Sequence, residues 1–216
     1  MKRFVVFILG FAVLPMVLWA TVRPQTDQDK PGYEQILKSN NGRYSKHGWN
    51  HYGPGYFELD RETGVLTSHG GMGLLWYSEK QYGDFVLELE YKTANATTNS
   101  GIFVRVPEMP TSDDYIYHSF EIQIDDSVEG IHHTGGVYDA EAPSEYPANP
   151  PGEWNHLEVT FQGDRIKVVL NGTQTVDWKA EPRGKITDFA QRGYIGLQNH
   201  DENSAVSFRN IYVKEL

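Results

Sequence analysis

Three short segments of the chain, at residues 102–106, 119–125 and 194–200, alternate apolar residues with polar or aromatic ones. Successive side chains of a β-strand point to opposite faces, so each segment would present one apolar row and one mixed row. The mixed rows consist of Phe103, Arg105, Glu121, Gln123, Asp125, Tyr194, Gln198 and His200. Antiparallel sheets commonly turn such a row toward solvent. The same mixture of hydrogen-bonding groups and rings also suits a flat polar ligand such as a sugar, and alternation alone leaves both interpretations open.

These side chains could supply acid–base catalysis in one of two ways. An ordinary glycosidase places two carboxyl groups roughly 5–5.5 Å apart for retention or roughly 6.5–9.5 Å apart for inversion. Glu121 and Asp125 lie four residues apart on one strand face, which separates their Cα atoms by about 13 Å. The alternative is a single base with a positive group at a developing oxyanion, and this needs no second carboxylate.

A divalent metal is the one cofactor that the sequence leaves open. Carboxylates and imidazoles are suitable ligands for Zn²⁺, Mn²⁺ or Ca²⁺, and the candidate ligands are His200, Glu121 and Asp125. No short run of ligands has the spacing of a known metal motif. His132 and His133 are adjacent, so their side chains diverge, and we expect them at most to edge a pocket.

The composition excludes several classes of protein. The chain has 216 residues and a formal net charge of −10, and a surface of that sign repels phosphate backbones and anionic lipid headgroups. We therefore expect no nucleic-acid partner, and a membrane contact only through an uncleaved N-terminal segment. The absence of cysteine excludes disulfides, thiolate metal sites and cysteine nucleophiles.

The N-terminus has the pattern of an export signal. Lys2 and Arg3 precede an apolar run over residues 4–19, as in a secretory signal peptide. The run is shorter than the roughly 20 residues that span a bilayer, which favours cleavage over an uncleaved anchor. We therefore expect a signal peptide at residues 1–20, a flexible lead at residues 21–32, and a periplasmic or secreted protein.

The rest of the chain, residues 33–216, is typical of a single all-β domain. Short alternating runs are punctuated by Gly, Pro, Asn and Asp, without an evident amphipathic helix of ten residues or more. The clearest strands are predicted at residues 85–91, 102–106, 117–125, 154–161, 165–170, 194–200 and 205–213. Asn171-Gly172 predicts a hairpin turn, and the proline-containing stretch 127–152 predicts a long loop of functional importance. About ten strands in one domain indicate a β-sandwich or jelly roll.

Six motifs occur once each along this domain. They are NSGIFVR at 99–105, FEIQI at 120–124, TGGVY at 134–138, EWN at 153–155, GYIGLQNH at 193–200 and FRNI at 208–211. In order and spacing this set resembles the 3-keto-disaccharide hydrolase family. The resemblance implies a concanavalin A-like jelly roll of two antiparallel sheets, in an exported bacterial protein that acts on oxidised glycosides. It assigns functional roles to Arg105, Glu121, Gln123, Tyr138, Gln198 and His200.

The chain departs from the family pattern at residues 201–203, where Asp-Glu-Asn replaces a glycine-rich run. We therefore expect the rim of the pocket, and with it the choice of substrate, to differ from the usual family member.

A 3-keto sugar changes the chemistry that the site must perform. Its C3 carbonyl acidifies the hydrogen on C2, so one base can remove this proton, the aglycone can leave from C1, and water can then add. We expect His200 or Glu121 to act as the base, and Arg105 or a bound metal to polarise the ketone. The residues expected to bind the substrate are Gln123, Asp125, Tyr138, Gln198 and Phe103.

Our first hypothesis is an exported hydrolase or lyase that cleaves 3-keto-glycosides or 3-keto-disaccharides. Its catalytic residues would be Glu121, His200 and Arg105, and its partner a carbohydrate. The second hypothesis is a non-catalytic carbohydrate-binding module of the same fold. A third is an ordinary β-glucan hydrolase, since residues 121–125 also look like the Glu-x-Asp-x-x-Glu signature of concanavalin A-like glucanases. Gln123 disfavours the third hypothesis because it replaces the central acid of that signature.

Overall fold

The computed structural model describes residues 30–216. The predicted signal peptide at residues 1–20, and residues 21–29 of the predicted lead, lie outside the described residues. Export therefore stays a prediction. Within residues 30–216, no helix has the length and apolar character needed to cross a membrane.

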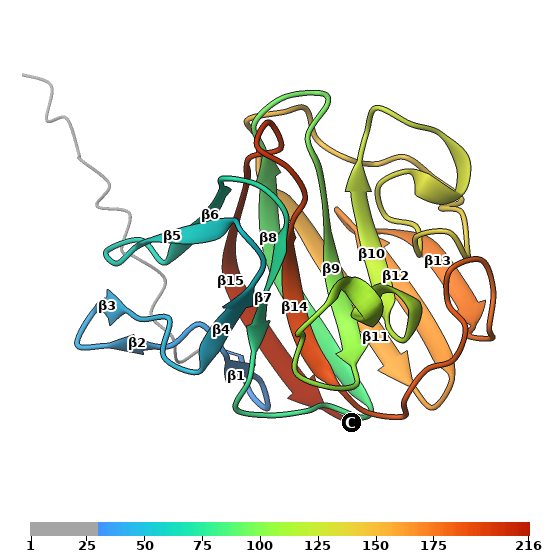
Figure 1. The fold of residues 1–216 in the computed structure, drawn as a ribbon, viewed down its shortest axis with the longest axis horizontal. Coiled ribbons are helices and arrows are strands. Elements are labelled where there is room, and N and C mark those ends of the chain that lie inside the picture. Colours follow the sequence, from blue (N-terminus) through green and yellow to red (C-terminus); the bar gives the residue numbers. More distant parts are fainter. Residues whose placement is uncertain (1–29) are drawn as a thin grey trace, which may run out of the picture.

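Strands make up nearly all of the regular structure in this range, together with two short 3-10 helices (Figure 1). The strands are β1 (Glu34–Gln35), β2 (Ser39–Asn40), β3 (Arg43–Tyr44), β4 (Trp49–Tyr52), β5 (Tyr56–Asp60), β6 (Val65–His69), β7 (Gly73–Tyr77), β8 (Phe85–Thr93), β9 (Asn99–Val106), β10 (Phe120–Asp125), β11 (Asn155–Gln162), β12 (Arg165–Leu170), β13 (Thr173–Lys179), β14 (Tyr194–Asn199) and β15 (Val206–Glu215). The 3-10 helices are η1 (Asp113–Tyr117) and η2 (Gly130–His132).

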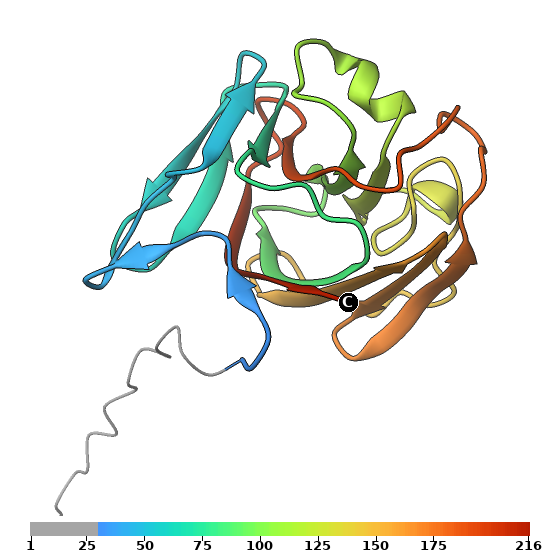
Figure 2. The ribbon, with the colours of Figure 1, turned by 90° about the horizontal axis from the view of Figure 1, so that it is seen from below.

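Two antiparallel sheets lie face to face, which confirms the predicted jelly-roll sandwich (Figure 2). The larger sheet has the order β13-β12-β11-β8-β15-β6-β5, with β1 paired to β15. The smaller sheet has the order β10-β9-β14-β7-β4, and β2 and β3 form a separate hairpin. This order makes β10, β9 and β14 neighbours, so the three segments with mixed rows share one sheet.

The apolar row of each of these strands packs between the two sheets. On β10, Phe120 is fully buried, and its ring meets Phe161 of β11 edge to face at a centroid distance of 5.1 Å. Ile102 of β9 and Leu197 of β14 are also fully buried in this core. Burying an aliphatic or aromatic side chain contributes about 1.5–3 kcal/mol each, and this fixes which face of the strands points outward.

All seven predicted strands are present, with ends displaced by a few residues. At β10 the strand begins at Phe120 and not at residue 117, because the chain before it turns as η1. Ser112 caps η1 by accepting a hydrogen bond from the Asp114 N–H. The predicted hairpin turn is confirmed, since Asn171 and Gly172 have φ values of 49° and 81° between β12 and β13. The seven strands β1 to β7 and the strand β13 were not predicted.

Candidate active site

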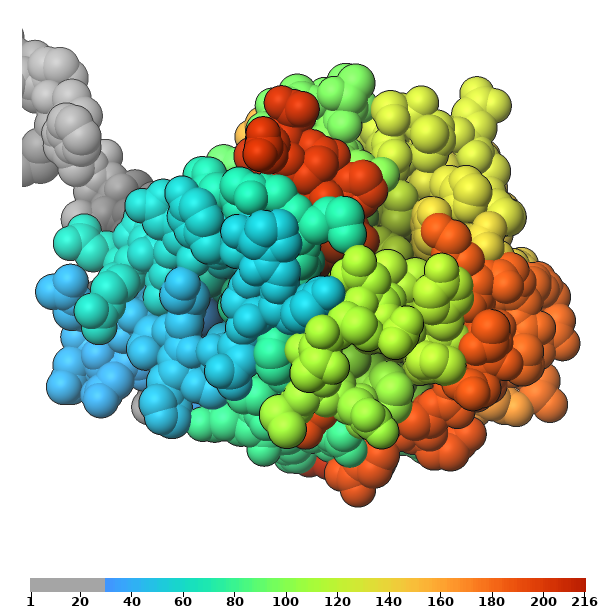
Figure 3. Space-filling view, viewed as in Figure 1, coloured from blue at the N-terminus to red at the C-terminus, as the bar shows by residue number. Residues whose placement is uncertain are grey.

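The outer face of the smaller sheet carries the candidate site, on the side where η1 lies (Figure 2). On this face Glu121 stands opposite Phe103, and Gln123 stands opposite Gly101. A pocket of about 130 Å³ opens here. Its lining residues are Met72, Gly73, Asn99, Tyr115, Ile116, Glu121, Gln123, Tyr138, Lys185, Gln198, Asn199 and His200. Figure 3 shows teal, lime, yellow, orange and red segments, far apart in sequence, meeting on the face turned to the viewer.

Glu121 is the only carboxyl side chain among the lining residues. It leans over Gly101 of β9, where an added Cβ would lie 2.2 Å from Oε1 of Glu121. The absence of a side chain at Gly101 thus leaves room for the carboxyl group. Burial raises the pKa of Glu121 to about 8, while the charge of Lys185 and a hydrogen bond with Gln198 act in the opposite direction. At neutral pH the group is therefore a neutral acid.

Tyr138 reaches the pocket because the irregular chain after β10 folds back along its free edge. The Tyr138 N–H donates to the Glu121 carbonyl at 2.9 Å, and the Gln123 N–H donates to the Gly136 carbonyl at 3.0 Å. These bonds extend the sheet beyond β10 and set Tyr138 beside Glu121. His132 lies against the Tyr138 ring at a centroid distance of 4.7 Å and does not line the pocket.

Lys185 is a pocket residue that the sequence did not reveal. It comes from the loop between β13 and β14, and its Nζ donates to the Tyr138 hydroxyl at 2.9 Å. Gly184 lets this loop pack closely against Asp139. Its φ is 56°, and a Cβ at position 184 would lie 1.9 Å from the carbonyl oxygen of Asp139. The loop has no periodic pattern, and only the glycine at 184 marks its tight turn.

Three of the amide side chains that line the pocket have oxygen atoms that accept no hydrogen bond within residues 30–216. The side-chain oxygens of Gln123, Gln198 and Asn199 are buried and have no hydrogen-bond partner in the described part of the chain. A buried polar atom without a partner costs roughly 1–3 kcal/mol. Ligand hydroxyl groups could donate to these oxygens, so the pocket is suited to a polyhydroxylated ligand.

His200 follows β14 directly and lines the same pocket as Glu121. Its Nδ1 lies 2.8 Å from Oδ2 of Asp201. The predicted pocket residues Glu121, Gln123, Tyr138, Gln198 and His200 therefore come together in one place.

Arg105 does not lie in this pocket, and its predicted placement on the outer face is wrong. Its φ of 56° and the register shift between β9 and β14 mark a β-bulge that breaks the alternation. The side chain is fully buried between the sheets, with its guanidinium carbon 3.6 Å from the Phe161 ring centroid. It donates to the Gly83 carbonyl at 3.0 Å and to Oδ1 of Asp84 at 3.2 Å. Arg105 is thus a cation of the core and cannot polarise a ligand in the pocket.

Two predicted substrate-binding residues also lie outside the pocket lining. Phe103 is on the expected face but fully buried, with the ring of Tyr115 above it at a centroid distance of 5.0 Å. Phe103 therefore supports the floor of the pocket and does not reach a ligand. Asp125 ends β10, where its Oδ1 accepts hydrogen bonds from the N–H and Oγ of Ser127 at 2.9 and 2.6 Å. Asp125 closes this turn and does not line the pocket.

The residues predicted as metal ligands do not form a three-ligand set. Glu121 and His200 line the pocket, whereas Asp125 is held in the turn with Ser127. Among residues 30–216, no three His, Asp or Glu side chains gather closely enough to hold a metal ion. The arrangement of these side chains does not fit a metal centre formed by the three candidate ligands.

Comparison with known proteins assigns the chain to a family. Residues 36–214 match the model of the 3-keto-α-glucoside-1,2-lyase-like domain. The chain belongs to this family. No curated protein sequence is significantly similar to it.

Solved structures support the same fold as the family match. A candidate glycosyl hydrolase from Parabacteroides distasonis is 25% identical with a TM-score of 0.70, and the match covers 85% of this chain and 99% of that one. A second candidate glycosyl hydrolase from the same organism is 24% identical with a TM-score of 0.72, covering 86% and 94%. The carbohydrate-binding module CBM66 from Bacillus subtilis is 18% identical with a TM-score of 0.54, covering 78% and 96%. The 3-keto-α-glucoside-1,2-lyase-like family and the 25% identical neighbour together indicate a glycosyl hydrolase-like protein, and the other two neighbours show the same fold.

Proposed function

We propose that this protein cleaves 3-keto-glycosides by elimination across C1 and C2 of the oxidised sugar. The observation that carries the proposal is the composition of the pocket. Its lining offers one neutral carboxylic acid at Glu121, one imidazole at His200 and one ammonium at Lys185, without a second carboxyl group. This set matches a reaction that needs one base, one acid and one positive charge.

The same composition disfavours ordinary glycoside hydrolysis. Both the retaining and the inverting mechanism need a pair of carboxyl groups beside the glycosidic bond. Glu121 has no such partner in the pocket, because position 123 is a glutamine and Asp125 is engaged with Ser127. A substrate that already carries a ketone at C3 removes the need for the pair.

In the proposed first step, Nε2 of His200 takes the proton from C2. The electrons of the C2–H bond form the C2–C3 double bond, and the carbonyl oxygen becomes an enolate oxygen. Lys185 stabilises this negative charge in the role first expected of Arg105. Its ammonium is positioned by the hydrogen bond to the Tyr138 hydroxyl at 2.9 Å.

In the second step the enolate collapses and expels the aglycone. The C3 carbonyl re-forms, a double bond forms between C1 and C2, and the C1–O bond breaks. Glu121 donates its proton to the departing oxygen, which its raised pKa of about 8 allows at neutral pH. Addition of water across the new double bond would complete the net hydrolysis of the glycoside.

The amide groups would hold the sugar in place during both steps. The unpaired oxygens of Gln123 and Gln198 are suited to accept hydrogen bonds from sugar hydroxyls. Tyr115 and Tyr138 add rings to the pocket lining, against which the C–H face of a sugar can pack. We propose further that the substrate is met outside the cytoplasm, on the strength of the signal-peptide pattern of residues 1–20.

The test incubates the purified protein with p-nitrophenyl 3-keto-α-glucoside and with 3-keto-trehalose. The corresponding unoxidised sugars are the controls, and each reaction is run with and without a chelator. We expect release of the aglycone from the keto sugars alone, unchanged by the chelator. Mass spectrometry should detect an unsaturated keto sugar that lacks one water, or its hydrated form. Cleavage of unoxidised glucosides at a similar rate would refute the proposal, and loss of activity with the chelator would refute its metal-free chemistry.

A second candidate function is a carbohydrate-binding module without catalysis, which the likeness to CBM66 favours. Calorimetric titration with the same sugars separates the two. A binding module would bind them without turnover, and replacing Glu121 or His200 by alanine would leave the affinity nearly unchanged.

A further inference from the structure

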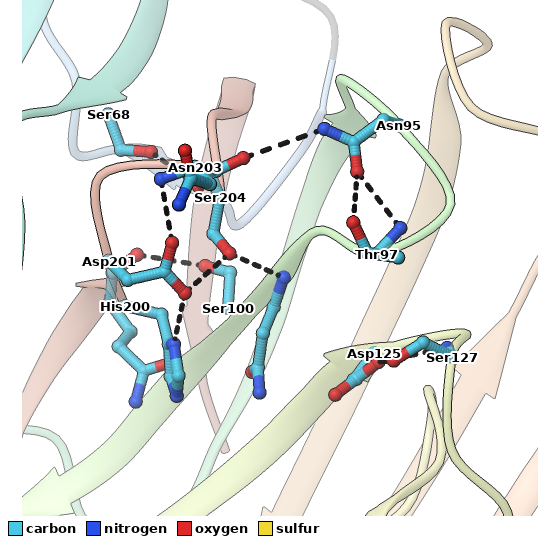
Figure 4. Close-up of polar contacts among 12 residues, drawn as sticks. Ser68, Asn95, Thr97, Ser100, Asp125, Ser127, His200, Asp201, Asn203 and Ser204 are labelled. Carbon is cyan, nitrogen blue, oxygen red and sulfur yellow. Dashed lines mark hydrogen bonds and ion pairs between the residues drawn. The ribbon is translucent and has the colours of Figure 1, made fainter.

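His200 and Asp201 form a hydrogen-bonded pair at the end of β14 (Figure 4). Oδ2 of Asp201 lies 2.8 Å from Nδ1 of His200 and also accepts a hydrogen bond from the Ser204 hydroxyl at 2.8 Å. Its other oxygen, Oδ1, accepts from the Asn203 N–H at 2.7 Å. The carboxylate is therefore held from two sides before it meets the imidazole.

The turn that holds Asp201 is tied to both sheets. The hydroxyl of Ser204 accepts a hydrogen bond from the N–H of Asn99, in β9 of the smaller sheet, at 3.1 Å. The carbonyl of Ser204 accepts from the hydroxyl of Ser68, in β6 of the larger sheet, at 3.3 Å. Figure 4 shows Asp201, Ser204 and Ser68 as successive members of this network. The position of the carboxylate is thus set by the frame of the domain.

We propose that Asp201 is a positioning residue that orients His200 for its role as the base and favours the imidazolium that it becomes. A carboxylate can only accept hydrogen bonds, so Nδ1 of His200 must donate the proton between them. The basic lone pair is then left on Nε2, the nitrogen that would take the C2 proton. Asp201 also stabilises the imidazolium that forms at that moment. This inference rests on the proposed function, since it names the partner of its base.

The other charged groups of the pocket make this partner necessary. Lys185 is a cation in the same pocket and opposes a second positive charge on His200. Glu121 is the only carboxylic acid of the lining, and it holds a proton of its own at neutral pH. Asp201 therefore supplies the negative charge that the imidazolium needs, and the hydrogen bonds to its carboxylate outweigh burial and lower its pKa.

The kinetic test compares Asp201→Asn with Glu202→Gln, which removes an exposed charge from the neighbouring position. For Asp201→Asn we expect kcat on the 3-keto-glucoside to fall about 10²- to 10⁴-fold with little change in KM. Glu202→Gln should match the wild type in both constants. A wild-type kcat in Asp201→Asn would overturn the proposal.

A second measurement does not depend on turnover. The ¹⁵N shifts of the His200 ring, assigned against His200→Gln, distinguish the two tautomers by NMR. We expect the Nδ1–H form in the wild type and its loss in Asp201→Asn. An Nε2–H form in the wild type would overturn the proposal even in an active enzyme. If no keto sugar is cleaved, the proposed function fails, and the tautomer still decides whether Asp201 orients His200.

Discussion

Replacing Glu121 by glutamine is expected to stabilise the protein, and to do so more strongly as pH rises. The side chain is 7% exposed, and burial raises its pKa from an ordinary 4.5 to about 8. Between these values the native chain keeps a proton that the unfolded chain has lost. Stability therefore falls as pH rises through this window. Glutamine has the same shape and no proton to lose.

The size of the effect follows from the shift. One pKa unit corresponds to about 1.4 kcal/mol, so the raised pKa of Glu121 costs the native state up to about 5 kcal/mol above pH 8. At pH 6 about 2 kcal/mol of this penalty is present. The advantage of Glu121→Gln in free energy of unfolding should thus grow by about 3 kcal/mol between pH 6 and pH 9.

Urea denaturation of both proteins at pH 6, 7, 8 and 9, followed by tryptophan fluorescence, measures this difference. Comparing the two chains cancels the pH dependence of every other group. Glu202→Gln is the matched control, since its side chain is exposed and its difference from the wild type should stay flat. A flat difference for Glu121→Gln would mean that Glu121 is ionised in the native protein, and the acid role assigned to it would fall.

Three further substitutions test the placement of individual residues. Gly101→Ala sets a Cβ 2.2 Å from Oε1 of Glu121 and should lower turnover about 100-fold, whereas Gly83→Ala, whose nearest neighbour is at 3.6 Å, should stay active in the same assay. Lys185→Met should lower kcat, because it removes the charge that stabilises the enolate. The loss should be only about 10-fold, because Lys185 is exposed and water weakens the effect of its charge. The substitution should also move the fall in rate that begins near pH 8 to higher pH, since Lys185 lowers the pKa of Glu121; an unmoved limb in the pH–rate profile would contradict their coupling. Arg105→Met should lower the free energy of unfolding by about 1–3 kcal/mol and leave kcat unchanged, and a large loss of kcat would return Arg105 to the site.

The sequence predicted those parts of the fold in which one face of a strand is uniformly apolar. In β10 and β14 every second residue is buried between the sheets, so parity placed Glu121, Gln123 and Gln198 on the outer face. The same reasoning failed for Arg105, because a bulge adds one residue to β9 without a Gly, Asn or Asp to announce it.

Residues supplied by irregular chain could not be predicted from periodicity. Only a family motif points to Tyr138, because its position depends on main-chain hydrogen bonds to the edge of β10. Lys185 lies in a loop, where no pattern distinguishes a pocket residue from a solvated lysine. In the sequence Asp201 is only a departure from the family pattern, and its contacts with His200 and Ser204 give it a role.

The free-energy cost of burying Glu121 helps to decide whether the pocket only binds a sugar or also catalyses its cleavage. A sugar-binding surface needs rings together with hydrogen-bond donors and acceptors, and a neutral amide at position 121 would supply both donors and an acceptor. The chain already uses glutamine for this purpose at positions 123 and 198. Compared with an amide, a carboxyl group at position 121 adds only the ability to give up a proton. It also destabilises the native state by up to about 5 kcal/mol above pH 8. The Glu121→Gln protein should therefore bind 3-keto-trehalose within a few-fold of the wild-type affinity in calorimetry. Its turnover should fall by about 10²-fold or more, because only proton transfer has been removed.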